Sequence, residues 1–215
     1  MEIDYKKFAQ IFSERTRINL DIITQMADAG GDVYEVTQLL NSLFGITIVS
    51  YELFFRNNNL LKSYEKEHIL DSTSGKELEK FIRDCEEKNI LKCTYANWDH
   101  KGIELVRHIR NSMSHSGNSG ISFFPLPEKG YSEPKDIKYV IFYDKNKSNR
   151  SACGDCEEEF CLLLSIDELR MLSYDIQNFF ADISKLYGEK AARKYEMHYK
   201  KVHKLLPDNN IIKIG

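Results

Sequence analysis

Turn-forming residues are scarce in this chain, with 11 glycines and 4 prolines among 215 residues. That shortage disfavours a fold built from many short strands and favours long helices. Internal repeats and low-complexity tracts are also missing, which argues against a solenoid or a disordered linker. Because 42% of the residues are hydrophobic and 29% are charged, we expect an ordinary globular protein with a substantial core.

The chain also lacks the marks of secretion and of membrane insertion. The N-terminus, Met1 to Lys6, carries acidic residues and no apolar run of signal-peptide length. The longest apolar stretch, near residues 43–55, is interrupted by Glu52 and is too short for a bilayer core of about 30 Å. Five cysteines with irregular spacing do not form a disulfide framework. We therefore predict a cytoplasmic protein with no membrane contact.

Several common catalytic signatures are missing as well. We find no glycine-rich phosphate loop, no serine nucleophile elbow and no carboxylate cluster suited to Mg²⁺. Cys153 and Cys156 have the spacing of zinc ligands, and Cys161 follows five residues later. No second cysteine pair or histidine partner lies nearby, so two thiols in a hairpin tip are favoured over a zinc site. We predict no metal and no cofactor.

Positive charge is limited, since the net charge is -3 and the pI is near 6.1. A nucleic-acid-binding protein would then need local positive charge to meet the phosphates. Residues 185–204 hold seven Lys or Arg against two acidic residues, with tyrosines interleaved. This pattern fits a track for single-stranded RNA, but a solvated helix whose tyrosines pack inward is favoured.

Apolar periodicity predicts a mostly α-helical fold. Helices are expected at 4–29, 33–56, 75–88, 100–114, 166–187 and 189–206. The second is apolar around much of its circumference, which predicts a central position. Capping-box spacing at Ser74–Glu77 and at Ser165–Glu168 predicts two of the helix starts. Gly188 predicts a bend before the last helix, which is read as a C-terminal extension.

The character of the chain changes after residue 120. Pro125, Pro127 and Pro134 forbid a continuous helix there. Residues 137–143 and 160–164 are rich in branched and aromatic residues, as strands are, and a polar loop at 144–159 is expected to join them. We predict one domain spanning 1–215, a helical bundle with a β-hairpin inserted at about 121–164, after the helix at 100–114.

That helix carries the candidate site. On a helical wheel its polar side chains fall on one face and its apolar side chains on the other, with Arg110 near the border. Asn111 and His115 are four residues apart, so they lie one turn over the other. The polar face also carries the side chains of Glu104, Arg107, His108 and Ser114.

These residue types suit RNA cleavage without a metal. An imidazole exchanges protons near neutrality and can act as an acid–base group. A guanidinium offers a planar fork of donors to phosphate oxygens. An amide can orient either partner. A lone Arg and His on a helix are nevertheless more often surface residues than catalysts, so this spacing alone is weak.

The segment Arg110-Asn111-Ser112-Met113-Ser114-His115 resembles the signature of HEPN domains, an Arg and a polar residue followed by a His. Residues 17–20 and 34–45 resemble the opening helices of a plasmid-borne, single-domain HEPN branch. In that branch an inserted hairpin and a helix with a Leu-Arg pair, here Leu169-Arg170, follow the motif. The similarity covers most of residues 10–187.

The resemblance implies a helical bundle that cleaves RNA as a symmetric dimer, often as a toxin or antiviral effector. By position, Arg110, Asn111 and His115 would be catalytic: Arg110 would hold the scissile phosphate, His115 would be the acid–base group, and Asn111 would orient His115 or the substrate. Products would end in a 2′,3′-cyclic phosphate. From the wheel we add Arg107, His108, Ser114 and Glu104 as candidate substrate-binding residues. RNA, a second copy of the chain and an antitoxin or regulator are the expected partners. The alternative is a HEPN-like dimer that binds RNA, nucleotide or protein without cleaving.

Overall fold

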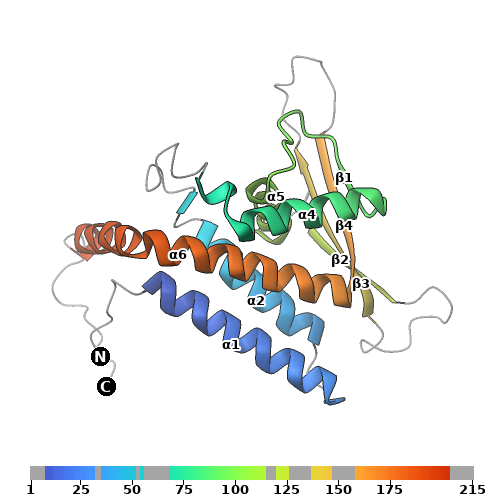
Figure 1. Ribbon diagram of the computed structural model, residues 1–215, viewed down its shortest axis with the longest axis horizontal. Coiled ribbons are helices and arrows are strands. Elements are labelled where there is room, and N and C mark those ends of the chain that lie inside the picture. Colours follow the sequence, from blue (N-terminus) through green and yellow to red (C-terminus); the bar gives the residue numbers. More distant parts are fainter. Residues whose placement is uncertain are drawn as a thin grey trace.

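The structure is a computed structural model that describes residues 8–31, 35–51, 54–55, 68–114, 120–125, 137–146 and 158–203, and side chains beyond residue 187 lie outside that description. The chain is mostly helical and carries one small antiparallel sheet (Figure 1). In chain order the elements are α1 (Phe8–Asp28), α2 (Glu35–Tyr51), α4 (Thr73–Glu87), β1 (Leu91–Cys93), α5 (Gly102–Ser114), β2 (Gly120–Pro125), β3 (Ile137–Asn146), β4 (Glu158–Ser165) and α6 (Ile166–His203).

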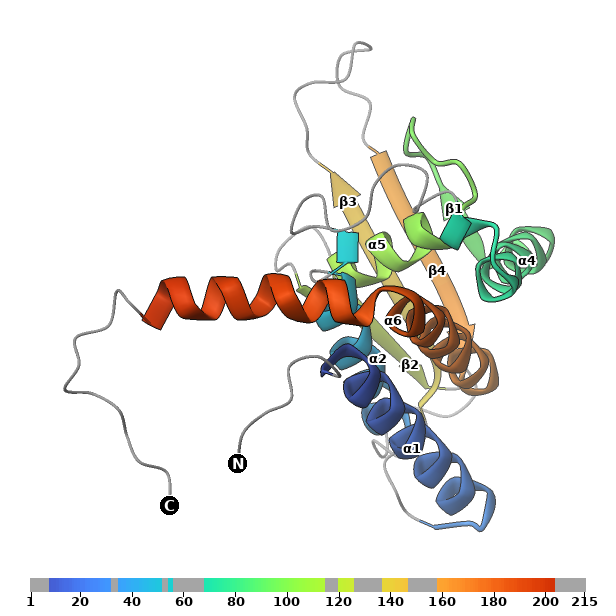
Figure 2. The same ribbon diagram turned by 60° about the vertical axis from the view of Figure 1, so that its left-hand side comes forward.

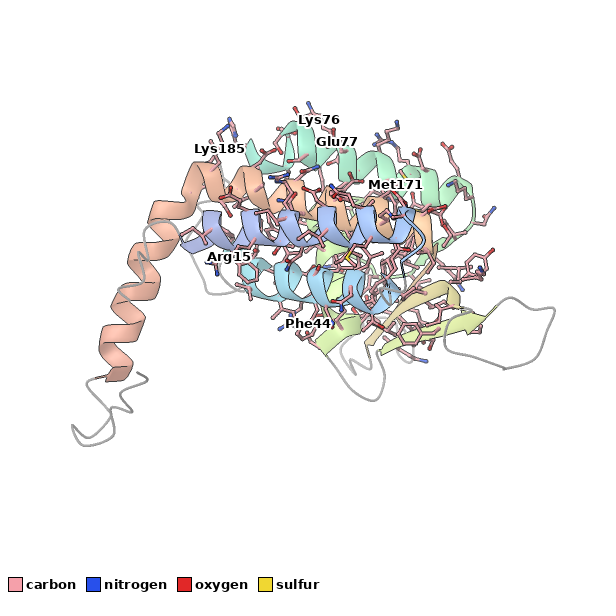
Figure 3. The ribbon with its side chains drawn as sticks, turned by 90° about the horizontal axis from the view of Figure 1, so that it is seen from below. Arg15, Phe44, Lys76, Glu77, Met171 and Lys185 are labelled. Atoms are coloured by element: carbon pink, nitrogen blue, oxygen red, sulfur yellow. The ribbon has the colours of Figure 1, made fainter. Side chains whose placement is uncertain are left out.

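Helix α2 has the central position that its apolar pattern predicts. It packs against α1, α5 and α6, and Figure 3 shows α1, α2 and α6 running side by side. A helix that is apolar around most of its circumference has to be covered on several sides. The buried side chains of α2 are Leu39, Leu40, Leu43, Ile46, Thr47 and Ser50. Among the residues described, no helical segment combines the length and hydrophobicity that a membrane crossing requires.

The sheet has the strand order β1-β4-β3-β2, and every neighbouring pair is antiparallel. Val140 lies opposite Leu164 and Phe142 opposite Leu162, and all four side chains are completely buried. This inner face packs against α5 and α6, and Figure 2 shows α5 lying across the sheet. The motif helix is therefore held between the sheet and helix α2.

The sheet differs from the expected two-stranded hairpin. Strands β3 and β4 cover the two predicted strands and pair with each other. However, β1 precedes α5 and pairs with β4, while β2 follows α5 and pairs with β3. The three residues of β1 are too few for a recognisable alternation, and only pairing with a distant strand makes them extended. The predicted polar loop is also shorter, because β3 continues to Asn146 and β4 begins at Glu158.

One predicted helix start is confirmed and one is wrong. At α6, the Glu168 backbone N–H donates to Ser165 Oγ (3.3 Å) and the Ser165 N–H donates to Glu168 Oε2 (3.0 Å), a reciprocal capping box. At α4, the N-cap is Ser72 and not Ser74, because Ser72 Oγ accepts from the Gly75 N–H (3.1 Å). The Ser74 hydroxyl instead donates to Asp182 on α6 (2.7 Å), a contact between helices that the local sequence does not reveal.

The two helices expected on either side of Gly188 are one helix, although the bend expected between them is present nearby. Helix α6 is one continuous helix of 38 residues. Its axis changes direction just beyond Lys185, as Figure 3 shows. A glycine inside a helix weakens it without having to end it, since its amide still donates to the preceding turn. The predicted C-terminal extension is thus the far end of α6.

Candidate active site

Helix α5 begins in close contact with helix α4. A Cβ atom added at Gly102 would lie 2.7 Å from Leu78 Cβ, so a larger residue would push the two helices apart. Just before the helix, Asp99 Oδ1 accepts a hydrogen bond from the Lys101 N–H (3.0 Å). Packing against α4 therefore fixes the position of the first turn of α5, and the rest of the helix runs toward the sheet.

Helix α5 is covered on both of its faces. Leu105, Val106 and Ile109 are completely buried in the core, as their spacing predicts. The opposite face was expected to be open and polar, but β2 and β3 pack against α5. His108 is consequently buried as well, with no exposed surface. The wheel placed the polar groups together correctly but did not reveal that a sheet covers part of their face.

The His108 imidazole has a hydrogen-bonding partner at each nitrogen. Its Nδ1 lies 2.8 Å from Asp144 Oδ2, and its Nε2 lies 3.3 Å from an Nη2 of Arg107. The ring stacks on Phe160, with centroids 4.7 Å apart and planes inclined by 10°. It also contacts Tyr95, at a centroid distance of 4.4 Å. His108 is therefore held in one orientation inside the protein, and its predicted contact with substrate stays a prediction.

Asp144 connects β3 to the motif helix. Its carboxylate is buried, with 4% of the residue exposed, and Oδ2 also accepts a hydrogen bond from Asn111 Nδ2 (3.0 Å). Burial, and after it the charge of Asp144, raise the pKa of the Tyr95 hydroxyl above its usual value. Tyr95 consequently stays protonated near neutrality beside this carboxylate.

Asn111 and Arg110 complete the chain of contacts. Arg110 Nη1 donates a hydrogen bond to Asn111 Oδ1 (3.1 Å). Arg110 exposes 9% of its surface, whereas Asn111 is half-buried. Asn111 therefore contacts Arg110, a partner that was not expected. The expected role of Asn111, to orient His115 or the substrate, stays a prediction, because His115 lies outside the described residues.

The remaining predicted residues lie around this network. Glu104 and Arg107 form an ion pair one turn apart on α5, and both are partly exposed. Ser114 is exposed and is the last residue of α5. The structure therefore brings Arg107, His108, Arg110 and Asn111 into one hydrogen-bonded group, with Glu104 attached at its outer end.

Asp144 is the residue that sequence reasoning missed. The predicted polar loop begins at Asp144, because the predicted strand ends at Tyr143. A signal was present, since Val140, Phe142 and Asp144 are spaced by two residues and alternate residues of a strand share a face. All three are buried in the structure. A carboxylate at an inward strand position requires a buried partner, which here is α5.

The structure brings no metal-binding cluster together within the segments it describes, where no group of three or more His, Cys, Asp or Glu side chains has suitable geometry. Cys161 is a free thiol on β4, while Cys153 and Cys156 lie outside those segments. Most side chains of the basic stretch 185–204 also lie outside those segments. The metal and RNA-track expectations for these residues stay predictions.

The arrangement can orient a cation toward an anion. Arg110 keeps its charge at any physiological pH, and its Nη1 is fixed by an amide that is fixed in turn by a buried carboxylate. Guanidinium groups held in this way bind phosphate oxygens through directed hydrogen bonds.

Comparison with known proteins gives one match. The model of the family described as HEPN pEK499 p136 matches residues 1–187, a span that includes α5 and the whole sheet. No curated protein and no solved structure matches the chain.

Proposed function

Because this chain belongs to the HEPN pEK499 p136 family, and so to the HEPN superfamily, we propose that it is a metal-independent endoribonuclease of the toxin or antiviral-defence kind. The observation that carries the proposal is the fixed guanidinium of Arg110, at the start of a segment with the family's Arg-to-His spacing. HEPN domains are often ribonucleases or toxins, and this chain keeps both motif residues.

In the proposed reaction the ribose 2′-oxygen attacks the adjacent phosphorus and the bond to the 5′-oxygen breaks. His115 accepts the 2′-hydroxyl proton or returns a proton to the leaving 5′-oxygen. Arg110 binds the phosphate oxygens and stabilises the charge that builds on them. The products are a 2′,3′-cyclic phosphate and a 5′-hydroxyl, and Asn111 holds Arg110 in place.

We propose secondary roles for the other predicted residues. Arg107 and Glu104 are partly exposed and would contact the RNA backbone beside the scissile phosphate, as would exposed Ser114. His108 would influence substrate binding from inside the protein and not by direct contact, because its ring is buried. In this proposal the protein is a dimer, and the second copy places its own motif in the same cleft. Residues 1–215 form one domain, which acts in the cytoplasm. An antitoxin or regulator restrains cleavage.

A non-catalytic HEPN-like module that binds RNA, nucleotide or protein is the second candidate. The observation that favours it is the low exposure of Arg110, 9% of its surface. A largely buried guanidinium reaches an anion only from one direction, which suits binding as well as catalysis. The retention of both the Arg and the His favours the enzyme.

The deciding experiment is RNA cleavage by the purified protein in excess EDTA, with His115→Ala run alongside His68→Ala, a control at an exposed histidine outside the motif. Total cellular RNA and bulk transfer RNA are offered, and product ends are tested for cyclic phosphate. We expect cleavage that survives EDTA, is lost in His115→Ala and persists in His68→Ala. Binding of RNA without cleavage by the folded protein would instead favour the second candidate.

A further inference from the structure

Five side chains form one continuous chain of hydrogen bonds between α5 and β3. The order is Arg107, His108, Asp144, Asn111 and Arg110, with successive distances of 3.3, 2.8, 3.0 and 3.1 Å. Four members lie on α5, and Asp144 alone comes from the sheet. The two ends of the chain are guanidinium groups, and its centre is a carboxylate.

The direction of every hydrogen bond in this chain follows from its ends. A guanidinium only donates, so Arg107 requires His108 Nε2 to accept, which assigns the proton of the imidazole to Nδ1. That proton is then donated to Asp144 Oδ2. From the other end, Arg110 donates to the oxygen of Asn111, which leaves the Asn111 amide nitrogen to donate to Asp144. All donors therefore point toward the one carboxylate.

Burial keeps this arrangement from relaxing. The His108 and Asp144 side chains are 1% and 6% exposed, so neither can exchange a lost partner for bulk solvent. If the Asn111 amide turned over, its nitrogen would face Arg110 Nη1 and its oxygen would face the carboxylate. Two hydrogen bonds would become repulsive contacts, and a buried polar group without a partner costs about 1–3 kcal/mol.

We propose that Asp144 is a positioning residue that orients the Arg110 guanidinium through Asn111. The inference rests on the proposed function for what Arg110 then does, which is to bind the scissile phosphate. Asp144 itself does not touch the reacting atoms. It fixes which way the Asn111 amide points, and the Asn111 oxygen fixes the direction of Arg110 Nη1.

The substitution Asp144→Leu tests this role, because it keeps a side chain of similar shape and removes the oxygen that both donors share. His108 Nδ1 and Asn111 Nδ2 both meet Asp144 Oδ2, so the leucine leaves neither of them with an acceptor. If Asn111 turns over in response, it presents its own nitrogen to Arg110, and the guanidinium moves. Asp144→Asn is the rescue variant, because an amide oxygen at the Oδ2 position can still accept from both donors.

The test is steady-state cleavage of an RNA oligonucleotide by the full-length protein, comparing wild type, Asp144→Leu, Asp144→Asn and Glu159→Gln. Glu159 is the control, since it is a carboxylate on the neighbouring strand that contacts Lys145 and Tyr143 and lies outside the hydrogen-bonded chain. We expect Asp144→Leu to lower kcat about 10²-fold, as a displacement near 1 Å can, and Asp144→Asn to restore most of that loss. KM should change much less, and Glu159→Gln should keep the wild-type kcat.

A kcat near the wild-type value in folded Asp144→Leu would overturn the inference and leave the proposed function intact. An equal loss in Glu159→Gln would also overturn it, because any carboxylate on the sheet would then have the same effect. Absence of cleavage by the wild-type protein would instead remove the proposed function, so the two failures are distinguishable.

A second measurement needs no variant. Two-bond ¹H–¹⁵N spectra of the wild-type protein report which nitrogen of each imidazole carries the proton, and the signal of His108 is assigned by nuclear Overhauser contacts with Tyr95 and Phe160, whose ring centroids lie 4.4 and 4.7 Å away. We expect His108 to be protonated at Nδ1 and bare at Nε2. A proton on Nε2 alone would reverse the direction of the hydrogen bonds and overturn the inference.

Discussion

Two arginines in this protein are held in opposite ways. Arg170 on α6 is contacted directly by carboxylates, with its Nε and Nη2 at 2.8 and 2.5 Å from Glu35 Oε1 and its Nη1 at 3.4 Å from Asp28. Arg110 on α5 donates to the neutral oxygen of Asn111, and the carboxylate of Asp144 stands one residue behind that amide. The carboxylates around Arg170 link three helices, whereas the amide beside Arg110 fixes the direction of one side chain.

The difference follows from what each contact does to the charge. A carboxylate in direct contact matches the guanidinium and joins the elements that carry the pair. The Asn111 oxygen is a neutral acceptor that fixes the direction of the Arg110 guanidinium. Arg170 belongs to the Leu-Arg pair of the motif resemblance, and its neighbour Leu169 is fully buried. We therefore expect this pair to serve stability and Arg110 to serve activity.

The largest effect that the comparison predicts is loss of cleavage in Arg110→Ala. Removing the cation from a developing oxyanion lowers kcat by about 10²–10³-fold. Arg110→Lys keeps the charge but loses the planar fork, so we expect most of the activity to be lost there too. Cleavage assays and thermal melts on the same preparations are the measurement. Full activity in a folded Arg110→Ala protein would place the chemistry elsewhere.

Arg170→Ala should show the reverse pattern. It leaves Glu35 and Asp28 without their shared cation at the α1–α2–α6 junction, and a charged hydrogen bond of this kind contributes about 1.5–3 kcal/mol. Urea unfolding should report a lower free energy of unfolding, while the activity per folded molecule stays close to wild type. Arg17→Ala is the control, because the Arg17–Asp21 pair is exposed and such pairs contribute little. Equal losses in both variants would remove the distinction.

A smaller and pH-dependent effect is expected at Asp175 on α6. Burial, and after it the charge of Glu77, raise the pKa of this carboxyl from 3.8 to about 6. Glu77 is on α4, which packs against α6 (Figure 3). The folded state thus binds the proton more tightly than the unfolded state, so stability falls as pH rises from about 4 to about 6.

Asp175→Asn removes this dependence. At pH 7.5 we expect its melting temperature to exceed that of the wild type by roughly 2–4 °C, and near pH 4 the gain should vanish. Melts across this range measure both. Asp182→Asn, at another α6 position facing α4, is the comparison and should not show this gain. An equal gain of Asp175→Asn at both pH values would show that charge burial is not its cause.

The sequence predicted most of the helices because their signals are local. Periodic apolar residues mark α1, α2 and α5, and the Ser165–Glu168 spacing marks the start of α6 to the residue. The sheet was only half predicted, since β1 is a three-residue strand that pairs with the distant β4, and β2 is extended through its pairing with β3. The N-cap of α4 is Ser72 and not the predicted Ser74, because the Ser74 hydroxyl has a partner on α6. No local sequence pattern reveals that partner.

The candidate site divides in the same way. The sequence by itself determined that the chain is a HEPN protein and that Arg110, Asn111 and His115 share a segment, because a motif is a matter of residue type and spacing. Only the tertiary structure decided that Asp144 lies behind Asn111 and that His108 is buried beneath the sheet. Strand pairing places β3 against α5. Asp144 therefore meets Asn111, although the two residues are 33 positions apart in the chain. Helical periodicity carries no information at that distance.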